Sequence, residues 1–292
     1  MLPRSVPIAA GDPGSLFVFG LGYTASRLAE RLARRGWRVT GTSRSGAAGT
    51  LAFYDKAAVL AALDGATHML VSTPPVDGTD PVLTAYGEVL RQYGGWTGYL
   101  SSTGVYGDTG GAWVDESALT GACRRSARAQ ADAEWLARGA RVFRLPGIYG
   151  PGRSALDRVA QGRAHRIELA NQVFSRIHVD DIVAGVIAGF GAPPGAFNLA
   201  DDLPCSQNEV IDFACGLLGL PPPPLMTMDE AGLSAMARGF YAENRRVANS
   251  KAKRVLGWAP TYPDYRAGLR ALTATTSPTS ATTAPAAPIG RH

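Results

Sequence analysis

The sequence contains very little lysine. Arginine supplies nearly all of the 29 basic side chains in the 292 residues, and the lysines are Lys56, Lys251 and Lys253. Cysteine is scarce as well, since the three cysteines form neither a C-x-x-C motif nor an even set that can pair. This usage favours reduced thiols in a cytoplasmic protein over a framework of disulfides.

Long apolar stretches are also missing. The most apolar segment, 182–190, is far shorter than the roughly 20 residues that a membrane-spanning helix needs. Residues 1–14 lack the continuous apolar stretch of a signal peptide, and we expect them to form a flexible N-terminus. We therefore expect a cytoplasmic protein that has no membrane partner.

Acidic residues are outnumbered, and the formal net charge is +5. A basic protein can bind nucleic acid. Here the arginines are scattered and no nucleic-acid-binding motif occurs, which favours a solvated surface together with sites for small anions. We therefore expect a small-molecule substrate, with an anionic one favoured, and no nucleic-acid partner.

Short apolar runs alternate with segments of helical periodicity. The run at 16–19 suits a strand buried on both faces, and the apolar residues of 23–35 recur at helical spacing. Further strands are predicted at 37–41, 68–72, 97–101, 141–145 and 196–199. Further helices are predicted at 57–63, 81–93, 123–138, 154–161, 180–190, 207–218 and 228–237. This alternation predicts an α/β protein with a Rossmann-type, doubly wound parallel sheet and a smaller C-terminal substrate domain.

The pattern loosens after residue 150, which suggests a division into two parts. We assign 15–150 and about 174–200 to a nucleotide-binding domain, and about 151–173 and 201–272 to a substrate-binding part. Residues 273–292 are almost entirely Ala, Thr, Ser and Pro up to 288, a composition typical of a disordered tail.

The segment after the first predicted strand fits the pattern G-x-G-x-x-A. Its first glycine permits a tight turn, its second lets the backbone approach a pyrophosphate, and its small last residue allows close packing of helix on strand. The start of the following helix offers free N–H groups to the phosphates. The strand before it and the helix after it are the context that supports dinucleotide binding. The expected cofactor-binding residues are Gly20, Gly22, Tyr23, Thr24 and Ala25.

The end of the second strand predicts which nucleotide binds. An NAD site expects an acidic residue about 20 positions further on, where it binds the ribose 2′-hydroxyl. The sequence has Thr42, Ser43 and Arg44 there, and no acid. Arg44 is suited to a 2′-phosphate and the two hydroxyls can donate hydrogen bonds to it, so we expect NADP(H) in preference to NAD(H). A solvated loop arginine is the alternative.

Five segments carry a family resemblance. They are YLSSTGVYG at 99–107, RLPGIYGPG at 144–152, IHVDD at 177–181, FNL at 197–199, and SKAK with LGWAP between 250 and 260. In this order they resemble the extended, or atypical extended, short-chain dehydrogenase/reductases, the group that contains nucleotide-sugar epimerases and dehydratases. The resemblance spans about residues 16–272, and it implies a nicotinamide cofactor and a substrate bound beside it.

The resemblance fails at the family's usual catalytic pair, a Tyr and a Lys four residues apart on a helix. In that pair the ammonium lowers the pKa of the phenol, which then moves a proton during hydride transfer. The residues four positions before the three lysines are Ala52, Val247 and Asn249. Alignment on the Ala-Glu at 133–134 puts Ser126 and Gln130 where the pair belongs. Fold and cofactor can be carried over from the family, but its standard mechanism cannot.

Three other hydroxyls are candidates for catalysis. Ser102 matches the family's serine, so it either polarises a substrate carbonyl or bonds the backbone at the strand end. Tyr149 is expected near the nicotinamide, with Arg153 four residues on as a partner that can activate the phenol; a packed tyrosine beside a substrate-binding arginine is the alternative. Tyr106 is the third candidate, although a tyrosine at this motif is more often structural.

Several loops are expected to line the cleft. Ligands of doubly wound sheets bind outside the carboxyl ends of the strands, which brings in Thr73 and Pro74, and the resemblance adds Ser101 and Pro146. Nucleotide-sugar enzymes of the family carry an arginine four residues before the His of HVDD, where this chain has Phe174, so a nucleotide sugar is disfavoured. The candidate substrate residues are Arg128, with Arg124 and Arg125 beside it or as a solvated face, Arg153, Arg176 and His178.

His178 and Asp180 also have structural interpretations, as a hydrogen-bonding residue and as the N-cap of the next helix. We expect an NAD(P)-dependent oxidoreductase, or an epimerase- or dehydratase-like enzyme, that acts on a small carbonyl, hydroxyl or sugar-type substrate with a non-standard proton donor. A non-catalytic NADP-binding sensor or interaction protein is the alternative. No metal site is expected, and a homodimer stays open.

Overall fold

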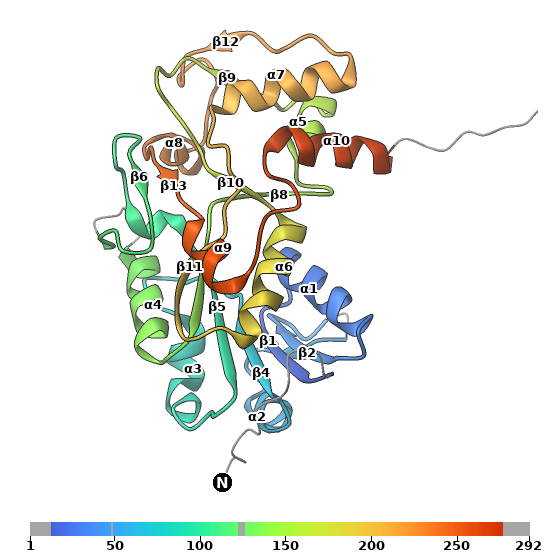
Figure 1. The fold of residues 1–292 in the computed structure, drawn as a ribbon, viewed down its shortest axis with the longest axis vertical. Helices are drawn as coiled ribbons and strands as arrows, with labels where there is room; N and C mark the ends of the chain where they lie inside the picture. The colour runs from blue at the N-terminus through green and yellow to red at the C-terminus, as the bar shows by residue number, and fades with distance from the viewer. Residues whose placement is uncertain (1–12, 48, 122–125, 277–292) are drawn as a thin grey trace, which may run out of the picture.

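The computed structural model describes residues 13–47, 49–121 and 126–276 (Figure 1). Predictions for 1–12 and 277–292, and those for Arg124 and Arg125, lie outside these residues. The helices are α1 Tyr23–Ala33, α2 Lys56–Asp64, α3 Pro81–Leu90, α4 Ser126–Ala137, α5 Ala155–Ala160, α6 Val179–Ala188, α7 Gln207–Leu218, α8 Ala235–Tyr241, α9 Ser250–Leu256 and α10 Tyr265–Thr276, with 3-10 turns η1 Thr103–Tyr106 and η2 Gly189–Gly191.

A seven-stranded parallel sheet forms the centre of the molecule, with strand order β11-β7-β5-β4-β1-β2-β3. Its strands are β1 Ser15–Phe19, β2 Arg38–Ser43, β3 Leu51–Ala52, β4 His68–Val71, β5 Trp96–Ser102, β7 Arg141–Leu145 and β11 Gly195–Asn198. The chain runs from β1 to one edge, then returns to β4 and runs to the other. This confirms the doubly wound α/β fold and places the ligand crevice outside the carboxyl ends of β1 and β4.

Helices cover both faces of the sheet (Figure 1). Because side chains alternate along a strand, Leu16 and Val18 of β1 pack with α1, α6 and α9, whereas Phe17 and Phe19 pack with α2, α3 and α4. All four side chains are buried, which explains the continuous apolar run at 16–19.

A smaller part lies beyond the carboxyl ends of the strands (Figure 1). Its core joins α5, α7 and α10 through Leu156, Ile211 and Leu269. The pair of β8 Gly147–Tyr149 with β10 Arg176–His178 joins the two parts, since Ile177 packs in the core of the sheet domain and Tyr149 in that of the smaller part. The pair of β9 Arg166–Ile167 with β12 Leu225–Met226 lies in the smaller part. The pair β13 Arg246–Val247 with β6 Trp113–Val114 links this part to the loops of the sheet domain. No helix in the described ranges is both long enough and apolar enough to span a membrane.

Three predictions about elements are wrong. The helix predicted at 228–237 begins only at Ala235, because Thr227 and Glu230 close a turn that ends at Gly232, where φ is +56°. Residues 250–258 were assigned to the substrate-binding part, but Ala252 and Trp258 pack into the core of the sheet domain. The tail predicted from 273 onward begins later, since α10 continues to Thr276.

Candidate functional site

The first glycine of the G-x-G-x-x-A segment forms a tight turn between β1 and α1. Gly20 has a φ of +88°, which favours glycine, and a Cβ there would lie 2.9 Å from Thr73 Oγ1. The Gly20 N–H donates to Thr42 Oγ1 at 3.1 Å, and Thr73 Oγ1 donates to the carbonyl of Phe19 at 3.1 Å. Thr73 thus supports the turn from the end of β4, and Pro74 beside it is exposed.

The second glycine faces open space. A Cβ built at Gly22 would meet no described atom within 4 Å, and no side chain of the described residues caps the N-terminus of α1, where Gly22 is the N-cap. Thr24 and Ala25 are buried behind it, while the Tyr23 hydroxyl donates to the carbonyl of Pro151 at 3.1 Å. An anion therefore has access to unpaired N–H groups at a helix N-terminus, which favours negative charge.

The three residues at the end of β2 have different surroundings. Thr42 is completely buried, so its hydroxyl supports the glycine turn and does not point to solvent. Ser43 Oγ accepts hydrogen bonds from Gly46 N at 3.1 Å and from Thr50 Oγ1 at 2.6 Å. Arg44 is exposed and has no hydrogen bond or ion pair with any described residue. Of the three, Arg44 is the side chain available to a 2′-phosphate.

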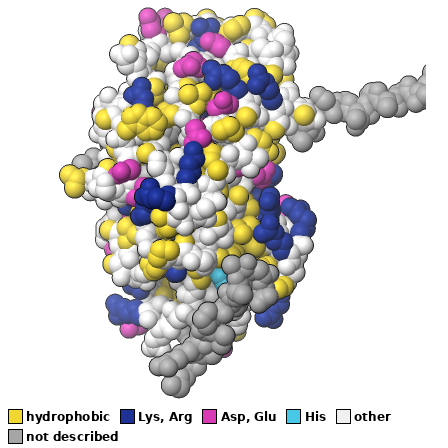
Figure 2. Space-filling view, viewed as in Figure 1, with side chains coloured by type: hydrophobic (Ala, Val, Ile, Leu, Met, Phe, Trp, Pro, Cys, Tyr) yellow, Lys and Arg dark blue, Asp and Glu magenta, His cyan; other side chains and the backbone are white. Residues whose placement is uncertain are grey.

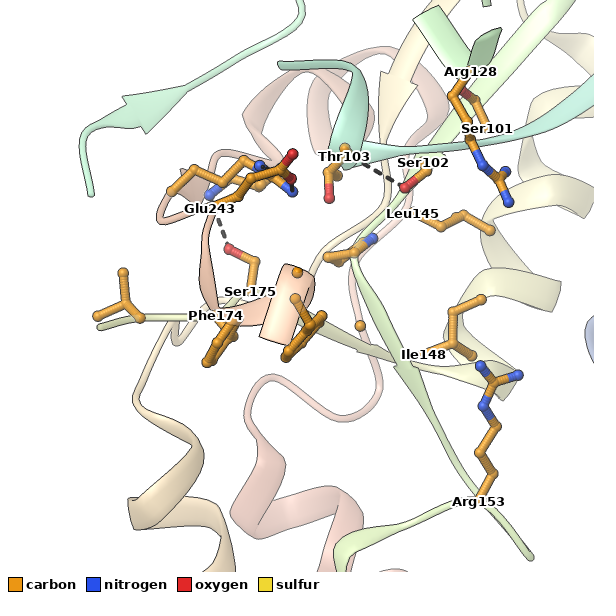
Figure 3. A pocket seen from close by; sticks show the side chains of 18 residues that line it. Ser101, Ser102, Thr103, Arg128, Leu145, Ile148, Arg153, Phe174, Ser175 and Glu243 are labelled. Atoms are coloured by element: carbon orange, nitrogen blue, oxygen red, sulfur yellow. Dashed lines mark hydrogen bonds and ion pairs between the residues drawn. The ribbon is translucent and has the colours of Figure 1, made fainter. Parts of the chain in front are cut away.

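A cavity of about 300 Å³ opens at the carboxyl ends of β5 and β7 (Figure 3). We call it the inner cavity; the predicted residues that line it are Ser101, Ser102, Arg128, Pro146 and Arg153. Ser102 Oγ accepts a hydrogen bond from Gly104 N at 3.1 Å, which leaves its own proton to donate. Both predicted roles of Ser102, bonding the backbone and facing a substrate, are therefore compatible with its position.

Charged side chains surround the inner cavity. In Figure 3, Arg128 and Arg153 extend toward each other on one side, and Glu243 lies on the opposite side. Glu243 Oε2 accepts from Arg245 Nη1 at 2.9 Å and Nη2 at 3.0 Å, and both side chains are largely buried. Sequence reasoning missed this pair, because it follows α8 in a segment that carries no motif.

Tyr106 belongs to a buried network and does not line the inner cavity. Its hydroxyl donates to Asn198 Oδ1 at 2.8 Å and accepts from Arg144 Nη1 at 3.0 Å. Arg144 in turn is paired with Asp132 at 2.7 Å, and Ser101 Oγ donates to the same carboxylate at 2.6 Å. Burial raises the pKa of Tyr106, although the positive charge of Arg144 opposes the rise.

Tyr149 and Arg153 do not form the predicted pair. The Arg153 guanidinium lies over the ring of Tyr23, 5.7 Å from its centroid. Burial raises the pKa of Tyr149 well above its ordinary value, and its hydroxyl is directed at α10, 3.5 Å from the carbonyl of Asp264. Since burial is the largest cause of the rise and the charge of Arg176 opposes it only in part, this phenol is a poor proton donor at neutral pH.

A second cavity, of about 700 Å³, lies between the β8–β10 strand pair and the helices α5, α7, α8 and α10. We call it the outer cavity; it shares Gly147, Ile148, Arg153 and Phe240 with the inner one. Arg176 lines it, but its guanidinium already donates to the carbonyls of Phe174, Cys205 and Ser206 and to Gln207 Oε1.

His178 lies behind these cavities and lines neither of them. It is buried between the rings of Tyr149 and Tyr262, and burial lowers its pKa. Its Nδ1 accepts from Asp180 N at 3.2 Å, so His178 is the N-cap of α6 and the prediction of Asp180 as N-cap is wrong. Asp180 instead pairs with Arg27 of α1 at 3.0 Å.

The helix that should carry the Tyr-Lys pair begins at Ser126. Further along it, Gln130 Nε2 donates to Glu134 Oε1 at 3.0 Å on an exposed face. Among the described residues that line the inner cavity there is no tyrosine, lysine or histidine. The usual proton-transfer groups are therefore missing at this position as well as from the sequence motif.

No family model matches the chain. It is 44% identical to a solved but functionally unknown conserved protein from Silicibacter pomeroyi, covering 90% of this chain and 99% of that one with a TM-score of 0.78. A 3-diazoavenalumate denitrifying reductase of a Streptomyces species is 32% identical over 140 residues, which span 44% of this chain and 45% of that protein.

The human epimerase family protein SDR39U1, solved with NADPH, is 18% identical with a TM-score of 0.70, covering 89% of this chain and 99% of that one. This likeness concerns the fold. The chain therefore belongs to the same family as the Silicibacter pomeroyi protein, and its fold is that of the extended short-chain dehydrogenase/reductases.

Proposed function

We propose that the chain is an NADP(H)-dependent oxidoreductase of the extended short-chain dehydrogenase/reductase type, which acts on a small carbonyl or hydroxyl compound without the usual Tyr-Lys pair. The observation that carries the proposal is the uncapped N-terminus of α1 at Gly22, where a Cβ would meet no described atom within 4 Å; Arg153, which lines the inner cavity, lies over the ring of the adjacent Tyr23. Two of the similar proteins support the proposal: the Streptomyces protein is a reductase, and the human protein of the same fold was solved with NADPH.

The residues of the turn fit a dinucleotide phosphate. Gly22 leaves space for it, the uncapped N-terminus of α1 supplies N–H groups, and Arg44 is free to meet a 2′-phosphate. When bound, the nicotinamide would supply or accept a hydride. The chain's own residues bind it, orient the substrate and handle the proton.

Ser102 is the residue that we assign to the substrate oxygen. Its proton is available to a carbonyl in the inner cavity, because Gly104 N occupies an acceptor position on its oxygen. Glu243 lines the inner cavity with its carboxyl group held by Arg245, and we assign to it the proton of a hydroxyl substrate, with water from the open cleft as the alternative carrier. Tyr106 and Tyr149 are held in hydrogen bonds elsewhere and are weaker candidates.

The cavities favour an enzyme over a sensor, because a protein that only binds NADP(H) does not need a substrate-sized space beside Ser102. On the face that Figure 2 shows, Lys and Arg side chains lie in separate groups with Asp and Glu among them. Such a surface lacks the single basic stripe typical of nucleic-acid binders.

Titration with NADPH and NADH tests the cofactor. We predict that the chain binds NADPH more tightly, and that Arg44→Ala lowers NADPH affinity by about tenfold or more, since a hydrogen bond to a charged group contributes about 1.5–3 kcal/mol. NADH affinity should stay unchanged in the variant. Tighter NADH binding, or an equal loss for both nucleotides, would contradict the proposal.

A further inference from the structure

We propose that the outer cavity binds the anionic end of the substrate, a carboxylate or phosphate group on an apolar body, through Arg158 and Arg163. The inference rests on the proposed function for the reacting end of the substrate. It concerns two arginines that no motif singled out, at the end of α5 and directly after it.

The charged residues that line the outer cavity are predominantly positive. Its described lining contains four arginines, Arg153, Arg158, Arg163 and Arg176, and a single carboxylate, that of Asp157. Asp157 Oδ2 already accepts from Ser154 N at 2.7 Å and from Ser154 Oγ at 2.6 Å, because it closes the capping box of α5. The cavity therefore holds a clear excess of positive charge.

Three of the four arginines already have contacts within the protein, and that of Arg163 is a single hydrogen bond to Gln161. Arg176 donates to three backbone carbonyls and to Gln207, and Arg153 lies over Tyr23. Arg158 has no hydrogen bond or ion pair from its side chain to a described residue. Although the residue is exposed at the mouth of the cavity, partial desolvation of its guanidinium is the largest cause that lowers its pKa, and the charges of Arg176 and Arg163 lower it further against the opposing effect of Tyr241. A bound anion would relieve this repulsion.

The local backbone brings Arg158 and Arg163 together. The chain reverses at Gly162, where φ is +63°, and the Arg163 N–H donates to the carbonyl of Arg158 at 2.8 Å. The Arg163 side chain is steadied by a hydrogen bond to Gln161 Oε1. Two guanidinium groups that start from one turn are suited to the several oxygens of a carboxylate or a phosphate.

The apolar residues of the outer cavity indicate which chemical group joins the anionic end of the ligand to its reacting end. Val210, Ile211 and Leu269 form an apolar side of the outer cavity. Where the two cavities meet, Phe174 and Phe240 stack with ring centroids 4.4 Å apart. A ligand that reaches from Ser102 to Arg158 therefore passes Ile148 and Phe240 at the junction as well as the exposed Arg153, so an aryl or alkyl chain finds apolar contacts there.

Calorimetric titration of the full chain with three matched compounds tests the proposal: 4-phenylbutyrate, 4-phenylbutyl phosphate and the uncharged 4-phenylbutanol. We expect at least one of the two anions to bind about tenfold tighter than the alcohol, and the better of them identifies the anionic group. The variant Arg158→Gln/Arg163→Gln should lose that advantage. Arg34→Gln/Arg35→Gln, which removes the same charge from the exposed end of α1, should keep it.

Equal binding of alcohol and anions by the wild type, or an equal loss in both double variants, would overturn the proposal. NADPH affinity separates it from the proposed function: we expect Arg158→Gln/Arg163→Gln to bind NADPH as the wild type does. Failure of NADPH to bind the wild type would count against the cofactor assignment, and the anion titration would still decide the role of the outer cavity.

Discussion

Asp201 is the most unusual single residue of the molecule. Its side chain is 1% exposed, and neither carboxyl oxygen has hydrogen-bond geometry to a described residue. Burial raises its pKa from 3.8 to about 8, although the charge of Arg176 and the nearby backbone N–H of Leu203 oppose the rise. Asp201 is therefore largely protonated in the folded protein at neutral pH.

This shift predicts how stability depends on pH. Because the folded state holds the proton more tightly than the unfolded state, the stabilisation is complete below 3.8 and is lost as pH rises to about 8. Over that window the wild type should lose up to about 1.4 kcal/mol per pH unit relative to Asp201→Asn. Urea unfolding of both proteins across the window measures the difference; parallel curves would show that Asp201 is ionised in the fold.

At the scale of residues, the positions that could be predicted from the sequence are those that belong to a recognisable motif. Gly20, Gly22 and Ser102 lie where expected, since each belongs to a motif with a backbone requirement. Glu243, Arg158 and Arg163 were missed, because they reach the cavities through tertiary packing of loops and helix ends that have no signature. Thr42 was predicted to donate to a 2′-phosphate but is buried beneath the glycine turn, since the side of a strand end on which a residue falls depends on a register that the sequence leaves open.

At the scale of elements, the two glycines of the turn between β1 and α1 have different roles, Gly20 in stability and Gly22 in the proposed binding of NADPH. Gly22→Ala should cost less than about 1 kcal/mol of stability, since its Cβ meets open space, yet lower NADPH affinity more than about tenfold because the methyl takes the place of a phosphate. Gly20→Ala should cost about 1–2 kcal/mol through its positive φ. Denaturant unfolding and NADPH titration check both variants. Undiminished NADPH binding by Gly22→Ala would remove the turn from the cofactor site.

The buried Asp132–Arg144 pair joins α4 to β7, with side chains 1% and 4% exposed. Asp132→Ala should destabilise the protein by about 3–5 kcal/mol, because it leaves the guanidinium buried and unpaired. Glu88→Ala is the matched control, since its pair with Arg91 is exposed and should contribute no more than about 1 kcal/mol. Similar losses in the two urea titrations would mean that the buried pair does not hold α4 in place.

Element prediction succeeded where periodicity is long. Helix α7 and strand β7 match their predicted ranges, and the other predicted strands of the parallel sheet differ from those observed by at most two residues at either end. Strands such as β9, β12 and β13 have two residues each, too few to show any alternation. The T-x-x-E pattern at 227–230 resembles a helix start, but here it closes an isolated turn, so α8 begins later than predicted.

At the scale of the whole molecule, the sheet was predictable and the assembly around it was only partly so. Strand-helix alternation gave the doubly wound topology. The placement of α9 and Trp258 on the sheet was missed, since Trp258 Nε1 donates to the carbonyl of Asp181 across 77 residues of sequence. Long-range contacts of this kind leave no trace in local periodicity.

The central claim is that this crevice transfers a hydride although the Tyr-Lys pair is missing. The most direct measurement supplies NADPH deuterated at its transferable position with a panel of aryl and alkyl aldehydes and ketones that carry a carboxylate or phosphate, and follows deuterium in the products by mass spectrometry. We predict deuterium transfer to at least one compound, reduced by Ser102→Ala and retained in Tyr106→Phe. Tight NADPH binding without deuterium in any product would contradict the claim and support a non-catalytic sensor.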